Sequence, residues 1–86
     1  MKLTITCEST KDTIIKKKQM YSYITELIDQ LGFYMNFTVN NTGEYKNIYI
    51  QFKVTNGLEL DVAQYVRNSI KDKYLTTNEK GYFIFK

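Results

Sequence analysis

Residues 33–54 have the sequence FYMNFTVNNTGEYKNIYIQFKV, and their pattern defines the centre of the fold. Apolar and polar side chains alternate over residues 33–40 and again over residues 47–54. Such alternation is typical of strands that bury one face and expose the other. Between the two runs, residues 40–43 (Asn-Asn-Thr-Gly) fit a tight turn with the glycine in the left-handed conformation. The stretch therefore predicts a β-hairpin.

The segment before this hairpin predicts a strand followed by a helix. Residues 2–8 alternate in the same way, and Cys7 falls on their apolar face. Ser9 and Asp12 have the spacing of a capping box, which predicts a helix that begins here and ends just before Gly32. The residues expected to face inward from this helix are Ile14, Tyr21, Ile24, Ile28 and Leu31, flanked by Met20 and Leu27.

The segment after the hairpin predicts a second helix and a final strand. Asn56 is expected to cap this helix, with Glu59 at the third helical position, and the helix should end near Lys73. A strand is expected over residues 82–85, and a short strand over residues 75–77 is its candidate partner. The residues expected to face inward from the helix are Leu58, Val62, Tyr65, Val66, Ser69 and Ile70.

The resulting order is β-α-β-β-α-β, in a single domain that covers residues 1–86. This order resembles the ferredoxin-like (split βαβ) arrangement, an α+β fold. The resemblance implies an antiparallel four-stranded sheet with two helices on one face, to which a C-terminal hairpin strand would be added. Because this fold hosts enzymes, metal carriers and RNA-binding proteins, the function has to be argued from particular residues.

The composition removes the chemistry of several proteins with this topology. The chain has no histidine, which is the usual general base and the commonest metal ligand. Acylphosphatases use a glycine-rich loop with an arginine after the first strand, and residues 8–12 (Glu-Ser-Thr-Lys-Asp) contain neither. Metal carriers of this topology use a Cys-x-x-Cys pair, whereas Cys7 is the only cysteine. We therefore expect a protein that is not an enzyme, has no cofactor or metal, and buries Cys7.

The setting of the protein is also suggested by composition. A single cysteine and the absence of an apolar stretch of about 20 residues predict a cytoplasmic protein without a membrane segment. Lys, Asn, Ile, Tyr and Phe, which have AT-rich codons, make up 40 of the 86 residues. This bias is expected of a low-GC genome, such as that of a Gram-positive bacterium, its phage or a plasmid.

With catalytic and metal-binding motifs absent, the exposed lysines and tyrosines are the candidate binding residues. Lysines cluster in the first half of the first helix, at Lys11 and residues 16–18, and outward-facing tyrosines are expected on the sheet. The candidate binding residues are Lys11, Lys16, Lys17, Lys18, Tyr34, Tyr49, Lys53 and Tyr82.

Two functions fit these binding residues. The first is docking on a host protein complex, as an inhibitor from a phage or mobile element that acts, for instance, on a defence nuclease. The alternative is a module for single-stranded RNA or DNA that uses the exposed sheet face and the basic helix. Pairing of the sheet face with a second copy, giving a homodimer, is left open.

Overall fold

The computed structural model describes residues 1–41 and 46–86, which form two helices and five strands. The hairpin prediction is confirmed, because β2 pairs antiparallel with β3 and places Val39 opposite Ile50. Of the turn predicted at residues 40–43, Asn40 and Asn41 lie in strand β2 instead, and residues 42 and 43 lie outside the described residues. The elements are β1 (Lys2–Thr6), α1 (Thr10–Gln30), β2 (Phe37–Asn41), β3 (Asn47–Phe52), α2 (Gly57–Tyr74), β4 (Leu75–Thr77) and β5 (Phe83–Phe85).

The sheet is mixed and five-stranded, with the order β2-β3-β1-β5-β4. The expected four-stranded antiparallel sheet is therefore wrong, because β5 lies between β1 and β4 and runs parallel to β1. A tight turn joins β4 to β5. The side chain of Asn78 accepts hydrogen bonds from the backbone N–H groups of Lys80 and Tyr82, both at 2.9 Å, and Gly81 takes a φ of 84°. The turn folds β5 back along β4, and the ferredoxin-like strand order is not confirmed.

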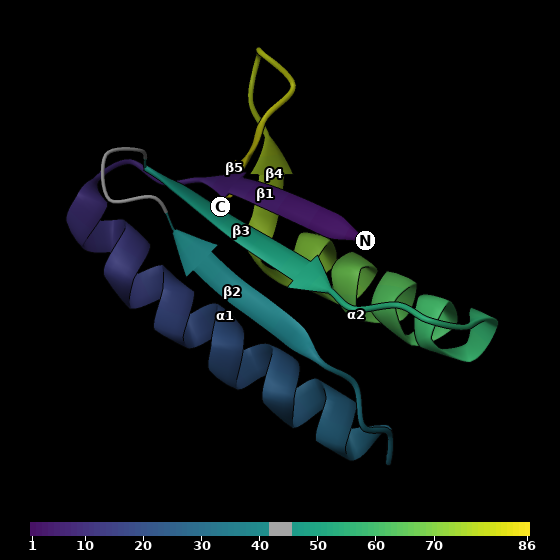
Figure 1. The fold of residues 1–86 in the computed structure, drawn as a ribbon. Coiled ribbons are helices and arrows are strands. Elements are labelled where there is room, and N and C mark those ends of the chain that lie inside the picture. Colours follow the sequence, from purple (N-terminus) through teal and green to yellow (C-terminus); the bar gives the residue numbers. More distant parts are fainter. Residues whose placement is uncertain (42–45) are drawn as a thin grey trace.

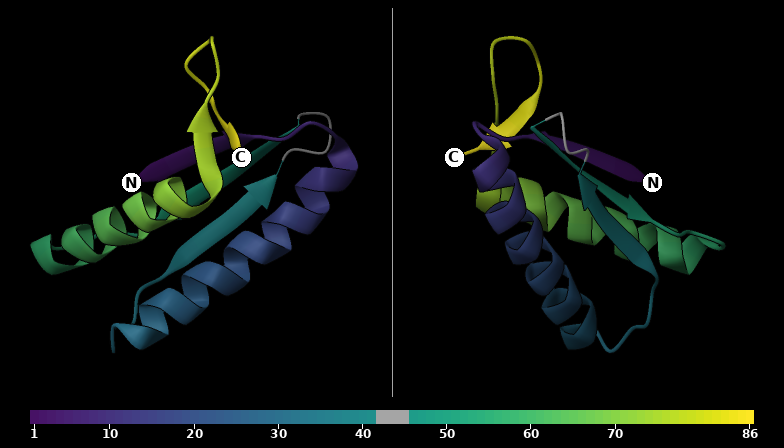
Figure 2. Two further views of the ribbon diagram at one scale, coloured as in Figure 1. Left: turned by 180° about the vertical axis from the view of Figure 1, so that it is seen from behind. Right: turned by 60° about the vertical axis from the view of Figure 1, so that its left-hand side comes forward.

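Both helices cover the same face of the sheet, and the core lies between the two layers. Figure 1 looks onto the open face with the helices behind it, and the left view of Figure 2 shows the helices from the other side. The apolar residues of the alternating strands face the helices, as expected. Leu3, Ile5, Ile48 and Ile50 are buried. Among the described residues, no helix combines the length and apolar character needed to cross a membrane.

The inward face of α1 differs from the expected one. Ser9 caps the helix as predicted, since its hydroxyl accepts the backbone N–H of Asp12 at 3.1 Å. The buried residues of the helix are Thr13, Met20, Ile24 and Ile28. Ile14, Tyr21 and Leu31 are exposed instead of buried. Thr13 can take the inward position because its hydroxyl donates to the carbonyl of Ser9 at 3.0 Å, which satisfies its polar atom.

The inward face of α2 is displaced in a similar way. Asn56 caps this helix, accepting the backbone N–H of Glu59 at 2.8 Å, as predicted. The buried residues are Ala63, Val66 and Ile70, whereas the expected Leu58 and Tyr65 are exposed and Val62 and Ser69 are only partly buried. Ala63, which the apolar pattern did not include, is fully buried at the centre of this face.

Candidate functional site

β2 forms one edge of the sheet, and some of its backbone groups point away from β3. The backbone N–H of Lys53 donates to the carbonyl of Asn36 at 3.0 Å, so these two residues form a hydrogen-bonded pair. Hydrogen-bonded and non-hydrogen-bonded pairs alternate along an antiparallel ladder. The backbone groups of Phe37, Val39 and Asn41 therefore face the outer edge of the sheet. Among the described residues, the outward-facing backbone groups of Phe37 and Val39 have no hydrogen-bond partner, so β2 offers donors and acceptors to an additional strand.

The sequence of β2 does little to protect this edge. Natural edge strands are commonly blocked by lysine, proline or a bulge, which prevent pairing with other chains. The five residues of β2, Phe-Thr-Val-Asn-Asn, include no charged residue and no proline. The strand at the opposite edge, β4, is only three residues long. β2 is therefore the edge better suited to pairing.

A shallow groove runs along this edge, between β2 and the outer side of α1. Two hollows of about 370 and 270 Å³ are lined by residues of both α1 and β2, and a third of about 370 Å³ beside them is lined by α1 alone. Together they form the groove, and Tyr21 lines all three. In Figure 1, α1 runs alongside β2, beyond the edge that β3 leaves free. The other lining residues include Lys17, Lys18, Ser22 and Val39 toward the end of β2, and Thr25, Glu26, Asp29, Phe33 and Phe37 toward its start.

Two contacts hold α1 beside the edge strand. Lys17 Nζ donates to the side-chain oxygen of Asn41 at 3.2 Å, and the rings of Tyr21 and Phe37 have their centres 5.2 Å apart. Tyr21 nevertheless remains 54% exposed. The groove is thus fixed at two points and still presents an aromatic surface at its centre.

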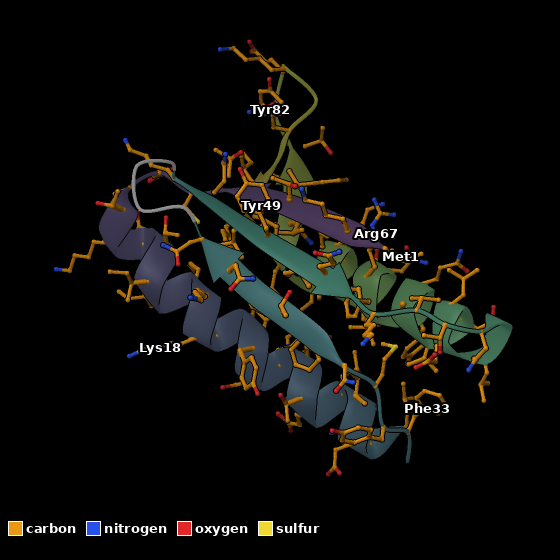
Figure 3. The ribbon with its side chains drawn as sticks, in the orientation of Figure 1. Met1, Lys18, Phe33, Tyr49, Arg67 and Tyr82 are labelled. Carbon is orange, nitrogen blue, oxygen red and sulfur yellow. The ribbon has the colours of Figure 1, made fainter. Side chains whose placement is uncertain are left out.

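The lysine run of α1 does not form one patch. Lys16 Nζ lies 4.9 Å from the ring centre of Phe85 on β5, whereas Lys17 reaches the opposite side, toward β2. Lys18 extends away from the sheet, and Lys11 is exposed in the first turn (Figure 3). Consecutive residues are about 100° apart around a helix, which explains the divergence. Of this run, Lys17 and Lys18 belong to the groove.

The predicted tyrosines are also spread over the molecule. Tyr49 lies on the open face of the sheet, whereas Tyr82 lies on the projecting C-terminal hairpin (Figure 3). Tyr34 is 85% exposed and precedes β2, six residues before Asn40, which pairs with Tyr49. Six strand residues span roughly 20 Å, so the two rings do not meet. Lys53 is exposed beyond the end of β3.

Cys7 lies in the core, as the alternation predicted. Burial raises the pKa of its thiol above the ordinary value, although a hydrogen bond with Thr13 acts in the opposite direction. The thiolate population at neutral pH is therefore small. The described part of the chain holds no cluster of three His, Cys, Asp or Glu side chains that would bind a metal ion.

No protein family, curated protein or solved structure matches the chain. The sequence pointed to Lys17 and Lys18 but not to the groove that contains them. The available signal was Tyr21, which shares a helical face with Lys18 and Thr25. The apolar pattern instead predicts that this face belongs to the core, because Tyr21 continues the pattern.

Proposed function

We propose that the protein is a non-enzymatic docking module that binds an extended segment of a protein partner along the free edge of β2. The observation that carries the proposal is the combination of an unblocked edge strand with the adjoining α1 groove. In this mode of binding, the backbone of the added segment pairs with the edge strand, and its alternate side chains enter neighbouring pockets. A partner from a host protein complex stays a prediction.

Two features of the geometry, the free backbone groups of β2 and the hollows beside them, support this mode of binding. The edge-facing backbone groups of Phe37 and Val39 lie next to hollows lined by Tyr21, so backbone pairing and side-chain contact occur at one place. Tyrosine is enriched in protein interfaces because its ring offers a large rigid surface with a polar end. Binding here would also cover an edge that is otherwise open to uncontrolled pairing.

Affinity capture tests the proposal. The protein, with a cross-linker attached on β2, is used to recover partners from cells of the organism that produces it. Tyr21→Ala removes the aromatic surface, and Val39→Pro removes an edge-facing N–H without breaking a bond to β3. We expect each variant to lower recovery of a specific partner by about tenfold or more, as when a central interface contact is lost. Circular dichroism establishes that each variant remains folded.

Two matched controls separate the groove from general effects. Tyr65→Ala removes a ring from α2 that is 53% exposed, almost the same fraction as Tyr21. Thr77→Pro places proline on the opposite edge, where the pairs of Asn78 with Tyr82 and of Lys86 with Tyr74 leave Thr77 facing outward. Both controls should retain the partner. Equal losses in all four variants, or no specific partner for the wild type, would contradict the proposal.

Single-stranded nucleic acid is the second candidate ligand, and one feature of the open face favours it. Lys2 Nζ lies 4.9 Å from the ring centre of Tyr49, and the outward-facing strand residues that the structure describes include no carboxylate. An anisotropy titration with single-stranded RNA tests this candidate. Binding that weakens steeply with salt, and that Val39→Pro leaves unchanged, would favour it over docking at β2.

A further inference from the structure

The position of α1 restricts what can occupy the edge of β2. α1 runs beside β2 and beyond its free edge, so an added strand would lie over the outer side of this helix (Figure 1, and Figure 2, right). A second copy joined through a two-fold axis at this edge would bring its own α1 into the same space. Paired strands lie about 4.8 Å apart, whereas packed helices need about 8–10 Å between their axes. A single extended segment fits without this conflict.

The charges along the groove change sign from one end to the other. Lys17 and Lys18 line the hollow next to Val39, whereas Glu26 and Asp29 line the hollow farther along α1. Lys18 and Glu26 are eight residues apart on the helix, which corresponds to about 12 Å, or three to four residues of an extended strand. Tyr21 and Ser22 lie between the two charged ends and belong to both hollows.

The direction of these charges is unfavourable for the helix itself. Apart from Asp12, which is favourably placed in the first turn, the charges of α1 oppose the helix dipole, with Lys16, Lys17 and Lys18 in the first half and Glu26 and Asp29 in the second. The last turn of α1 contains no basic residue. α2 has the usual arrangement, with Glu59 in its first turn and two lysines in its last. Helix stability therefore does not account for the positions of Lys17, Lys18, Glu26 and Asp29, and these side chains are free to serve binding.

We propose that the occupant of the groove is an extended segment of a partner protein with opposite charges at its two ends. Its carboxylates face Lys17 and Lys18, an apolar side chain covers Tyr21, and its basic residues face Glu26 and Asp29. Because antiparallel pairing is slightly stronger than parallel pairing, the segment runs opposite to β2, with its acidic end first. This inference rests on the proposed docking at β2 and adds the chemistry of the partner.

A display library of random nonapeptides, selected on the full-length protein, tests the inference before any cellular partner is identified. We expect selected peptides to carry Asp or Glu near the N-terminus, an aliphatic residue in the middle and Lys or Arg near the C-terminus. A second selection uses the variant with Lys18→Glu and Glu26→Lys, which leaves one positive and one negative charge at each end and keeps the net charge. Peptides selected on this variant should show no preferred order of charges.

Binding measurements on one selected peptide complete the test. Reversing the charges of the peptide should weaken its binding to the wild type by about three- to tenfold, as expected for two exposed ion pairs. The doubly substituted variant should bind the two peptides about equally. A control variant with Lys80→Glu, at the tip of the C-terminal hairpin, should bind like the wild type.

The possible failures are distinguishable. Peptides that bind and lose affinity in Val39→Pro, but show no order of charges, would overturn this inference and leave docking at β2 intact. Failure to select any peptide that depends on Val39 would overturn both. A dimer in analytical ultracentrifugation that Val39→Pro dissociates would identify a second copy as the occupant, and would overturn the inference as well.

Discussion

Glu59 illustrates how a few side chains fix the start of α2. Its carboxylate accepts hydrogen bonds from the hydroxyl of Thr55 and from the backbone N–H of Thr55, the latter at 2.9 Å. These bonds lower the pKa of Glu59 below its ordinary value, with the hydroxyl as the largest cause. Because the folded state favours the ionised form, the bonds stabilise the protein above the ordinary pKa. This contribution is lost as the pH falls through the lowered pKa.

We expect an NMR titration of the Glu59 carboxyl group to show this lowered pKa directly. Thr55→Val removes the hydroxyl donor and should raise the pKa of Glu59 toward its ordinary value. The control is Thr76→Val, which removes an exposed hydroxyl from β4 and should not change the titration. An unchanged pKa of Glu59 in Thr55→Val would show that the hydroxyl bond does not form.

At this residue scale, the sequence predicted the structure well. Ser9 and Asn56 cap the two helices as expected, and Gly32 has a φ of 66° just after the end of α1. Each of these predictions depends only on residues within a few positions of one another. Local hydrogen bonding is therefore sufficient to place them.

At the scale of whole elements, the faces of the helices were harder to predict. α1 has apolar side chains on several sides, since Ile14 and Ile15 are exposed whereas Ile24 and Ile28 are buried. The pattern alone is compatible with more than one inward face. The rotation that occurs is selected by packing against β2 and α2, which a local pattern does not contain. For the same reason, the groove beside Tyr21 was not predicted as a site.

The difference between the two faces of α1 predicts a clear contrast in stability. Ile24→Ala removes a fully buried side chain and should lower the free energy of unfolding by about 2–5 kcal/mol. Ile14 is 56% exposed, and Ile14→Ala should change the free energy of unfolding by no more than about 0.5 kcal/mol. Urea denaturation of both variants measures the contrast. Equal destabilisation would mean that the inward face of α1 is assigned wrongly.

At the scale of the whole molecule, the order of the strands was the main error of prediction. The residues of β4 and β5 were found, and β4 pairs with β5 antiparallel, with Leu75 opposite Phe85. The pairing of β5 with β1 joins segments nearly 80 residues apart, and no local pattern indicates it. The two registered residue pairs between β1 and β5 connect the C-terminal hairpin to the rest of the sheet. A destabilising substitution in the turn of the C-terminal hairpin should therefore lower the free energy of unfolding of the whole domain.

Gly81 provides the test of this coupling. Its φ of 84° lies in a region that L residues adopt only with strain, although a Cβ atom there would meet nothing within 4 Å. Gly81→Ala should therefore lower the free energy of unfolding by about 1–2 kcal/mol, through backbone strain alone. Gly57→Ala is the matched control, because it also meets nothing within 4 Å but lacks a positive φ, and it should be neutral or stabilising by up to about 1 kcal/mol.

If the hairpin is part of the cooperative unit, urea denaturation followed at Tyr49 and at Tyr82 by NMR will give the same lowered midpoint in Gly81→Ala. A midpoint lowered at Tyr82 alone would show that the hairpin unfolds separately from the sheet.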